Sequence, residues 1–471
     1  MKIAFCSAEV FPFAKTGGLG DVCGALPLAL AKLNLEIAVF LPYYRCIHDK
    51  KWKLTKINDW LLKTTLAKKI EIYFIKHDYF FNRPGLYGDE KGDYPDNLER
   101  FHYYCRCVLR ALKELNIKAD IIHCHDWQTS LIAVDLKEKY KKDPFYSAAR
   151  TLLTIHNLAY QGVFPKEEYS KLGFREDLFG LHGFEFFGKI NLLKAGIIFS
   201  DALNTVSPQY AKEIQTRHFG CGLDGVLRSR KDRIVGILNG LNYDFWNPQV
   251  DPLIEKKYSL ETFGADKLEN KKALQRQTKL PVSATIPLLG FVARLAHQKG
   301  IDLILDSIEE LVELYEIQFI VQGEGNGQYS GRLREMVQRF PQKFAVWFEF
   351  DEKMAHQIYA GSDFFLMPSL FEPCGLSQMI SLKYGTIPIV FKTGGLVDTI
   401  IPFNKDKRGG NGLMFEHYNK KEFINIIKSA VEIFDDKEQL FRLISRAFLA
   451  DFSWDKSANQ YVELYQHCMK I

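Results

Sequence analysis

The stretch that decides the fold is Lys15-Thr16-Gly17-Gly18-Leu19-Gly20-Asp21, near the N-terminus. The apolar run Ile3–Cys6 precedes it and an apolar-periodic segment, 22–33, follows it, which predicts a strand, a glycine loop and a helix. Glycines let the backbone turn sharply or lie against a ligand, and a helix N-terminus beyond them favours phosphate. A turn without a ligand is the alternative, because the glycine spacing misses the dinucleotide-binding pattern by one residue.

A second copy of this loop lies far down the chain. Lys392-Thr393-Gly394-Gly395-Leu396-Val397-Asp398 follows the apolar run 388–391 and precedes Ile400. A pattern that recurs in the same context near both ends indicates two related α/β halves. The chain has 471 residues, which is more than one ordinary core accommodates, so a division into two or three domains is expected.

Composition and charge exclude several classes of protein. The hydrophobic fraction of 47% is ordinary for a globular protein, and the net charge of +5 gives no reason to expect a nucleic-acid partner. We find no signal peptide and no apolar run long enough to span a bilayer, so no membrane partner is expected. Nine dispersed cysteines without paired zinc-type spacing favour a reduced, cytoplasmic protein. The oligomeric state cannot be read from the sequence.

Strands alternate with helical patterns through both halves of the chain. Apolar runs of strand length recur at 37–41, 72–75, 119–123, 150–155, 201–206, 286–293, 318–322, 364–369 and 388–391. This alternation predicts mostly parallel sheets with helices on both faces. Ligands bind beyond the carboxyl ends of the strands in such sheets, so polar residues directly after each strand are the candidates for a site.

Two strand ends in the first half are rich in polar residues. One strand runs into His123-Cys124-His125-Asp126-Trp127, and the next is followed by His156-Asn157. Two histidines and an aspartate could bind a metal, but alternate residues of an extended segment point to opposite faces, and no further ligand group stands nearby in the sequence. We therefore expect no metal and prefer a polar rim that contacts a hydroxylated substrate. A plain strand terminus is the alternative.

The second half offers two cations and a carboxylate in similar positions. Arg294 and Lys299 share one loop after a strand, which suits a diphosphate because Arg clamps it with parallel hydrogen bonds while Lys supplies a point charge. Glu372 follows another strand, and Pro373 is preorganised for the start of a helix. Glu372 could simply cap that helix, but the neighbouring cations favour a role as an acceptor for sugar hydroxyl groups.

These motifs resemble those of bacterial glycogen synthases and plant starch synthases, which are retaining glycosyltransferases of the GT-B fold, with two Rossmann-like α/β domains facing across a cleft. The motifs that carry the resemblance occur in order along the chain, at Lys15–Val22, His125–Trp127, His156–Gly162, Asn239-Gly240, Arg294–Gly300, Glu372–Leu376 and 392–396. The resemblance implies an N-terminal domain at 1–240 on the acceptor side and a donor-binding domain at 241–455. It also implies that a last helix, 456–471, packs back on the first domain.

The resemblance implies a role for each matching residue. Arg294 and Lys299 match the pair that binds the donor diphosphate and offsets charge on the departing ADP. Glu372 matches a carboxylate that hydrogen-bonds glucose, while Asp21 and His156 match residues at the donor glucose; these five form the expected catalytic set. The other substrate-binding residues implied, with Phe350 placed by spacing alone, are Lys15, Gly17, Gly18, Asn239, Phe350, Cys374, Gly375, Leu376, Thr393 and Gly394. On the acceptor side the implied residues are His125, Asp126 and Trp127.

The implied reaction is transfer of glucose from ADP-glucose to the non-reducing end of an α-1,4-glucan such as glycogen, with retention of configuration. ADP-glucose is a co-substrate, and no metal or other cofactor is expected. This chain departs from the pattern at Ile380, where many retaining relatives carry a second glutamate, and at Asn242, where the family commonly has an aspartate. UDP-glucose as the donor and a non-catalytic glucan-binding protein stay open as alternatives. An NAD-type oxidoreductase is a third, although neither glycine loop has its spacing.

Overall fold

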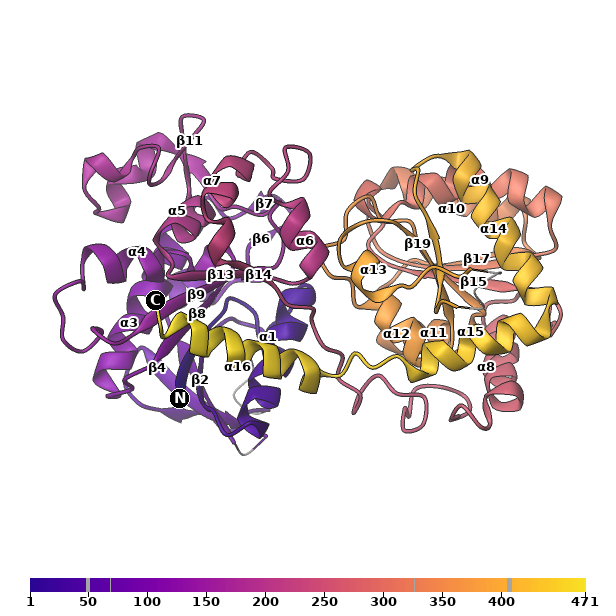
Figure 1. Cartoon of the computed structure of the whole chain (residues 1–471), viewed down its shortest axis with the longest axis horizontal. Coiled ribbons are helices and arrows are strands. Elements are labelled where there is room, and N and C mark those ends of the chain that lie inside the picture. The colour runs from indigo at the N-terminus through magenta and orange to yellow at the C-terminus, as the bar shows by residue number, and fades with distance from the viewer. Residues whose placement is uncertain (48–50, 68, 326, 405–408) are drawn as a thin grey trace. The chain divides into compact units, whose positions relative to one another are not determined.

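The computed structural model describes residues 1–47, 51–67, 69–325, 327–404 and 409–471, which divide into two compact units (Figure 1). The first unit combines Met1–Gly240 with Trp454–Ile471, and the second holds Leu241–Ser453. The main segment of the first unit ends at Gly240. The last helix belongs to the first unit and begins slightly before the expected residue 456.

The sheet of the first unit has the strand order β14-β13-β9-β8-β1-β2-β5-β4-β3. Its strands are β1 Lys2–Cys6, β2 Glu36–Pro42, β3 Thr55–Lys56, β4 Leu61–Leu66, β5 Ile70–Ile75, β8 Ile121–His125, β9 Arg150–Ile155, β13 Ala202–Thr205 and β14 Ile234–Gly236. Every neighbouring pair from β14 to β5 is parallel, whereas β4 and β3 continue the sheet antiparallel. The sequence predicted the parallel part; it missed the antiparallel edge, where residues 61–66 mix apolar and polar types without a clear period.

Helices lie on both faces of this sheet, as the alternating pattern predicts (Figure 1). They are α1 Gly18–Lys32, α2 Asp78–Phe81, α3 Asn97–Glu114, α4 Leu131–Glu138, α5 Leu192–Phe199, α6 Pro208–Glu213, α7 Asp224–Ser229 and α16 Trp454–Cys468. Two small antiparallel sheets are built from β6 Gly88–Asp89 and β7 Gly92–Asp93, and from β10 Val163–Pro165, β12 Lys189–Asn191 and β11 Glu185–Phe186. Strand β1 is buried on both faces, which explains its unbroken apolar sequence.

The C-terminal helix α16 is anchored to the sheet by a buried hydrogen-bond chain. His123 Nδ1 lies 2.8 Å from the hydroxyl of Tyr465, and its Nε2 lies 2.6 Å from Oγ1 of Thr154. Thr154 donates to Oδ1 of Asn204 (2.5 Å), whose Nδ2 donates to the hydroxyl of Tyr461 (3.1 Å). Burial holds the pKa of His123 well below its usual range, so the ring is neutral. A neutral imidazole offers one donor and one acceptor, which are the two groups that this series of hydrogen bonds requires.

The sheet of the second unit is parallel throughout, in the order β17-β16-β15-β18-β19-β20. Its strands are β15 Leu288–Val292, β16 Gln318–Gln322, β17 Phe344–Trp347, β18 Phe364–Met367, β19 Ile387–Phe391 and β20 Leu413–Phe415. Its helices are α8 Phe263–Gln277, α9 Ile301–Leu314, α10 Gly327–Arg339, α11 Glu352–Gly361, α12 Ser377–Lys383, α13 Gly394–Thr399, α14 Lys420–Asp435 and α15 Lys437–Leu449.

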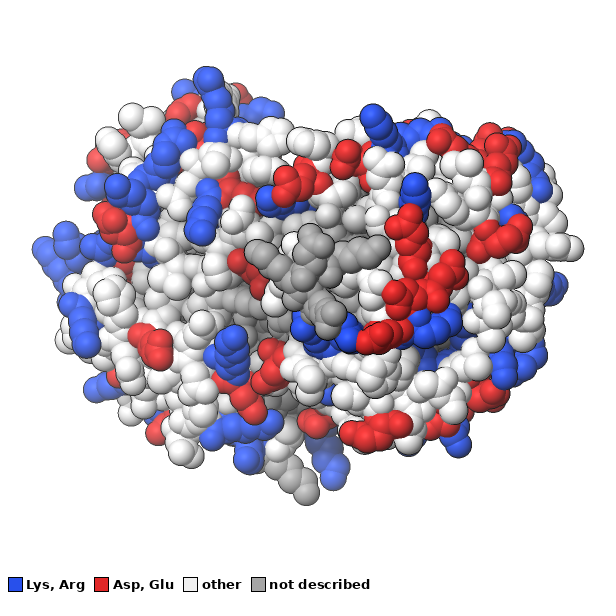
Figure 2. All heavy atoms as spheres, turned by 45° about the vertical axis from the view of Figure 1, so that its right-hand side comes forward, with Lys and Arg blue, Asp and Glu red and all other residues white. Residues whose placement is uncertain are grey.

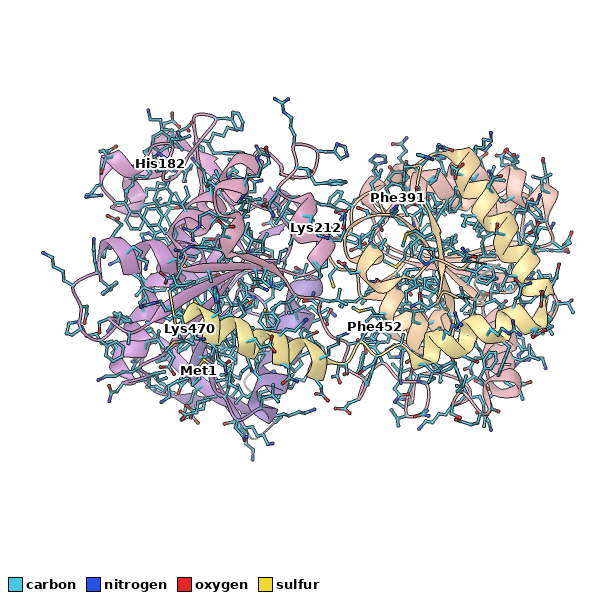
Figure 3. The ribbon with its side chains drawn as sticks, in the orientation of Figure 1. Met1, His182, Lys212, Phe391, Phe452 and Lys470 are labelled. Atoms are coloured by element: carbon cyan, nitrogen blue, oxygen red, sulfur yellow. The ribbon has the colours of Figure 1, made fainter. Side chains whose placement is uncertain are left out.

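The two chain segments that connect the units are joined to one another. The backbone N–H of Leu241 donates to the carbonyl of Phe452 (2.6 Å), and Leu241 forms a parallel bridge with Ser453. Figure 3 labels Phe452 on the returning segment. The outgoing and returning segments therefore run side by side where the chain passes from one unit to the other.

The described surface has mixed charge. Basic and acidic side chains are interspersed on the face drawn in Figure 2, which accords with the small net charge of +5. Among the described residues, no helix combines the length and the apolar character that crossing a membrane requires.

Replacing Tyr465 by Phe tests the anchoring of α16. Tyr465→Phe keeps the ring but leaves His123 Nδ1 buried without its partner, so we expect the free energy of unfolding to fall by about 1–3 kcal/mol. Urea denaturation followed by tryptophan fluorescence measures this. Tyr79→Phe is the control, because Tyr79 is 71% exposed. Equal stability of the two variants would contradict the proposed anchoring.

Candidate functional site

Both sheets reverse their strand order, and candidate residues lie at each reversal. In the first unit the chain runs from β1 outward through β2 to β5, and β8 then returns to the other side of β1. In the second unit the chain runs from β15 through β16 to β17, and β18 returns beside β15. Ligands bind at such switch points, beyond the carboxyl ends of the strands. The carboxyl ends of β1, β8, β15 and β18 and the segments that follow them carry Lys15–Asp21, His125–Trp127, Arg294–Lys299 and Glu372–Leu376, respectively.

The glycine loop of the first unit contains an ion pair. Lys15 Nζ lies 2.6 Å from Asp21 Oδ1, and both side chains are about one-third exposed. Helix α1 begins at Gly18, with Gly17 as its N-cap in an extended conformation. A Cβ added at Gly17 or Gly18 would meet nothing within 4 Å, so neither position needs glycine to avoid a neighbouring atom. Their open backbone leaves room for a ligand, and that role stays a prediction.

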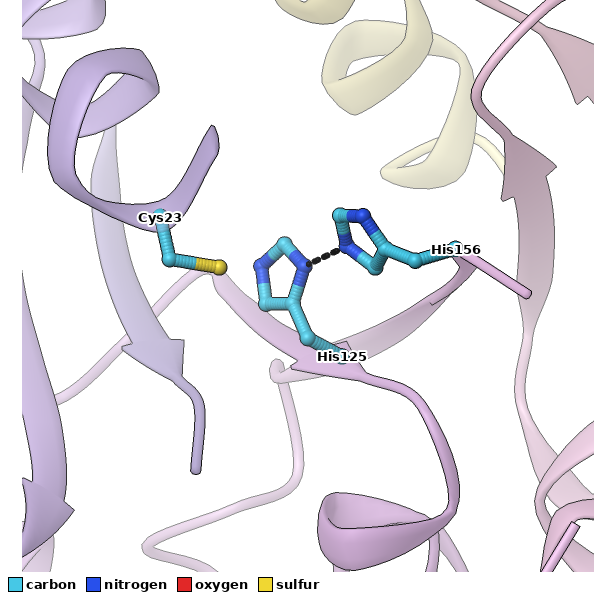
Figure 4. A group of neighbouring side chains, drawn as sticks. All are labelled: Cys23, His125 and His156. Carbon is cyan, nitrogen blue, oxygen red and sulfur yellow. Dashed lines mark hydrogen bonds between the residues drawn. The ribbon is translucent and has the colours of Figure 1, made fainter. Parts of the chain in front are cut away.

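His156 and His125 form a buried imidazole pair. His156 Nε2 lies 2.9 Å from His125 Nδ1 (Figure 4). Burial lowers the pKa of His156 to about 3 and holds that of His125 well below its usual range. Both rings are therefore neutral at physiological pH. His156 can hydrogen-bond a sugar hydroxyl as a neutral group, but it does not supply a positive charge.

Asp126 fixes the position of His156 through the backbone. Its Oδ1 accepts a hydrogen bond of 2.7 Å from the backbone N–H of His156. Asp126 has a φ of +55°, which is uncommon for a residue other than glycine and marks a locally strained backbone. Burial raises the pKa of Asp126 to about 7. This aspartate thus acts on the site by orienting the segment that carries His156.

The residues expected to contact the glucan acceptor are buried. The ring of His125 packs 4.3 Å from that of Phe5 and has no exposed surface. The indole of Trp127 lies against Gly162, where an added Cβ would approach the ring to 2.5 Å. Both side chains are buried within the first unit, and His125 hydrogen-bonds His156. Contact of His125, Asp126 and Trp127 with the acceptor stays a prediction.

Cys23, His125 and His156 are a group that could hold a metal ion. One potential ligand atom from each lies within 4.8 Å of the others, and all three residues are buried (Figure 4). A thiolate with two imidazoles would suit zinc. However, burial raises the pKa of the Cys23 thiol well above its usual range, which disfavours the thiolate, and the two rings already share a hydrogen bond. The observed contacts thus account for the two rings without an ion.

The second unit pairs Lys299 with Glu372. Lys299 Nζ lies 2.5 Å from Glu372 Oε2, and their side chains are 19% and 9% exposed. The two loops are also joined through the backbone, since Leu370 donates to the carbonyl of Gln298 (2.9 Å). Arg294 is exposed and has no carboxylate within 4.0 Å among the residues the structure describes. Its guanidinium is therefore available to an anionic ligand.

The second glycine loop packs directly on the Glu372 segment. The backbone N–H of Gly395 donates to the carbonyl of Glu372 (3.0 Å). Gly394 has a φ of +44°, and an added Cβ there would lie 2.0 Å from the carbonyl oxygen of Glu372. Gly375 has a φ of +73°, so glycine is favoured at both positions. The structure thus brings together the predicted residues Lys299, Glu372, 374–376 and 393–394.

Two predicted substrate-binding residues carry buried oxygens with no partner among the described residues. They are Asn239 Oδ1 in the first unit and Thr393 Oγ1 in the second. Such atoms are costly unless a ligand or water satisfies them. Phe350 differs, because it is 69% exposed after β17, and no ring or cation–π contact joins it to the Arg294–Lys299 loop in the described part of the chain. A stacking role for Phe350 stays a prediction.

Sequence reasoning missed Glu9. Its buried carboxylate accepts hydrogen bonds from the backbone of Thr16 and Gly17, from the Thr16 hydroxyl and from Tyr87. One signal was present, since Glu9 is a charged residue in an otherwise apolar stretch soon after strand β1, and the other candidate residues also follow strands.

Two family models match the chain in succession. Residues 2–229 match the starch synthase catalytic domain, and residues 275–447 match the glycosyl transferases group 1. Together with the two Rossmann-like units and the polar residues at their switch points, these matches define a glycosyltransferase of the GT-B fold.

Similarity to individual proteins identifies the family. The chain is 41% identical to a glycogen synthase of Thermodesulfovibrio yellowstonii over 99% of this chain and 97% of the relative, and 43% identical to one of Alkaliphilus metalliredigens over 99% of each. The solved catalytic domain of starch synthase IV from Arabidopsis thaliana, bound to ADP and acarbose, matches with a TM-score of 0.91 and 33% identity, over 100% of this chain and 99% of that one. The chain belongs to the glycogen and starch synthase family, which confirms the resemblance and the predicted fold class.

Asp126 provides a test based on pH. Because its native pKa of about 7 lies above the ordinary value of 3.8, the folded protein holds a proton that the unfolded chain releases between these values. Raising the pH through this window should therefore lower the stability of the wild type, with a slope of up to about 1.4 kcal/mol per pH unit. Asp126→Asn cannot titrate and should lack this contribution to the slope.

Urea denaturation at pH 5, 6, 7 and 8 measures the difference in stability between the two proteins. We expect the free energy of unfolding of Asp126→Asn to increase relative to that of the wild type as the pH rises. Asp232→Asn, at an exposed position of the same unit, is the control. Parallel pH profiles for the wild type and Asp126→Asn would contradict the raised pKa.

Proposed function

We propose that the chain transfers glucose from ADP-glucose to the non-reducing end of an α-1,4-glucan, with retention of the α configuration. The observation that carries this proposal is the Lys299–Glu372 pair at the switch point of the second sheet, with Arg294 in the same loop as Lys299. The end-to-end identity to glycogen synthases supports the same activity. The ADP bound to the starch synthase relative supports adenosine diphosphate as the leaving group.

In the proposed mechanism, Arg294 and Lys299 stabilise the negative charge that develops on the departing ADP. Preorganised electrostatic stabilisation of this kind is often the largest single contribution to catalysis. The diphosphate replaces Glu372 as the partner of Lys299. The Glu372 carboxylate then accepts hydrogen bonds from glucose hydroxyls, so the donor satisfies both members of the pair.

Retention is proposed to follow a same-face route without a covalent glucosyl-enzyme. The position where many retaining relatives have a second glutamate is Ile380, a buried apolar residue of α12. The leaving phosphate oxygen departs from the face of the sugar on which the acceptor hydroxyl attacks. That oxygen takes the acceptor's proton as the new glycosidic bond forms.

Residues of the first unit complete the proposed donor site. His156 hydrogen-bonds glucose as a neutral imidazole, held by Asp126 and His125. Lys15 and Asp21 contact the donor through the glycine loop.

We further propose that the reaction needs no metal or other cofactor. Charge on the diphosphate is instead met by Arg294, Lys299 and helix N-termini. A cytoplasmic location is also proposed, since a reducing compartment suits the nine free cysteines.

Incubation with ADP-[14C]glucose, glycogen and EDTA tests the proposed activity. We expect labelled polymer and one ADP released per glucose transferred, at a rate unaffected by the chelator. UDP-[14C]glucose in a parallel reaction tests the alternative donor and should be turned over more slowly. Absence of labelled polymer, faster use of UDP-glucose or loss of activity with EDTA would each contradict one part of the proposal.

Variants of the ion pair test the assignment of roles. Lys299→Ala and Glu372→Ala should each lower kcat/KM for ADP-glucose by about 10²–10³-fold, because each removes a charge aimed at the donor. Lys420→Ala is the matched control, since Lys420 forms a half-exposed pair with Glu310 (3.0 Å) in the same unit. Steady-state kinetics would reject the assignment if either site variant kept the activity of the control.

A further inference from the structure

We propose that Glu9 is a positioning residue that holds the Lys15–Asp21 loop in the shape the donor site requires. Glu9 follows strand β1 by three residues and is only 3% exposed. Its Oε2 accepts from the backbone N–H of Thr16 (2.6 Å) and of Gly17 (3.3 Å), and its Oε1 accepts from the Thr16 hydroxyl (2.7 Å). This inference rests on the proposed function of the loop as part of the donor site.

Gly17 and Gly18 are the open part of the loop. A Cβ added at either position would meet nothing within 4 Å, so no distant side chain packs on these two residues there. Glycine also loses more conformational freedom on ordering than any other residue. Hydrogen bonds to an ionised carboxylate are stronger than those between neutral groups. The contacts with Glu9 therefore offset the entropy lost when this open loop adopts one conformation.

Hydrogen-bond donors, and not a cation, compensate the burial of the Glu9 carboxylate. No Lys, Arg or His side chain lies within 4.0 Å of its carboxylate among the described residues. A buried carboxylate without a cation must be compensated by donors, and here the donors belong mostly to the loop itself. If the loop moves away, the carboxylate loses these partners. The conformation of the loop and the hydrogen bonding of the buried Glu9 carboxylate thus depend on one another.

Glu9 also joins the loop to a second segment. The hydroxyl of Tyr87 donates to Oε1 of Glu9 (2.7 Å). The segment that carries Tyr87 is itself fixed, because Asn97 Nδ2 donates to the carbonyl of Tyr87 (2.8 Å) and the buried Arg100 donates to the carbonyl of Leu86 (3.1 Å). The loop is therefore held, through Glu9, against a rigid part of the first unit.

The same contacts assign Glu9 to positioning and not to direct chemistry. Its carboxylate oxygens already accept from the loop and from Tyr87, and the side chain is buried. It acts on the reaction through Lys15 and Asp21, because it binds the backbone of Thr16 and Gly17, which lie between them. A displacement of a catalytic group by about 1 Å can lower the reaction rate 10²-fold. An effect of Glu9 on turnover is therefore expected although Glu9 does not contact the substrate.

Glu9→Gln tests the inference. Glutamine has the same size as glutamate, but its NH2 group donates and so cannot accept the hydrogen bonds that one carboxylate oxygen of Glu9 accepts. We expect kcat/KM for ADP-glucose to fall about 10- to 100-fold, with KM for glycogen unchanged. Hydrogen–deuterium exchange should show faster exchange of residues 15–20 and unchanged exchange of α16. Glu36→Gln is the control, because Glu36 forms an exposed pair with Lys2 (3.1 Å) in the same unit.

Thr16→Val is the milder variant, which removes only the hydroxyl contact with Oε1 and keeps the backbone contacts. It should change kinetics and exchange in the same direction but by less, and it tests the inference if Glu9→Gln does not fold. Unchanged exchange of residues 15–20 in these variants would overturn the inference. So would a fractional loss of activity that equals the fraction of unfolded variant, because unfolding alone would then explain the loss. Failure of the proposed function is distinguishable, because it leaves the wild type inactive while the exchange difference persists.

Discussion

Parallel strand pairing is the constraint on which the candidate site depends in each unit. Phe5 of β1 pairs with Val39 of β2 on one side and with His123 of β8 on the other, so the three strands end at one edge of the sheet. In the second unit Gly290 of β15 pairs with Phe365 of β18. Because parallel strands end together, loops far apart in sequence meet at the same edge. Packing then determines which of their side chains face a ligand and which support them.

Each unit pairs one candidate lysine with one candidate carboxylate. Lys15 and Asp21 are partly exposed, and such a pair contributes little to stability, so the donor can separate it at small cost. Lys299 and Glu372 are more buried, and separating them is costly unless each finds a new partner. ADP-glucose can provide both partners, since its diphosphate is an anion and its glucose hydroxyls are donors. The more buried pair thus favours a ligand that carries phosphate and sugar together.

The sequence predicted the two α/β halves and the second-unit site because both depend on local patterns. The repeated glycine loop marks equivalent strand–helix junctions, and the residues after each strand lie where parallel topology gathers ligands. Other features depend on packing between distant residues, which local patterns do not report. Tyr465 contacts His123 across 342 positions of sequence, and the ring of His125 is buried against that of Phe5. The proposed role of Glu9 likewise follows only from the structure, because the sequence does not show that the Lys15–Asp21 loop hydrogen-bonds its carboxylate.

The glycines of the first loop show the limit of reading conformation from residue type. The sequence left open whether Gly17 and Gly18 make a sharp turn or lie against a ligand, and the structure gives them open space and an extended N-cap. At Gly394, by contrast, the neighbouring carbonyl leaves no room for a Cβ. Two loops with nearly the same sequence therefore use glycine for different physical reasons. The first keeps the backbone accessible, and the second allows close packing on the Glu372 segment.

The central claim is that the Lys15–Asp21 loop of the first unit contributes to the donor site. Its most direct test is the steady-state kinetics of Lys15→Ala in the first unit, measured separately for ADP-glucose and for glycogen. The account predicts that kcat/KM for ADP-glucose falls while KM for glycogen is unchanged, although the diphosphate cations Arg294 and Lys299 are intact in the second unit. An unchanged kcat/KM for ADP-glucose would contradict a donor site that includes the glycine loop.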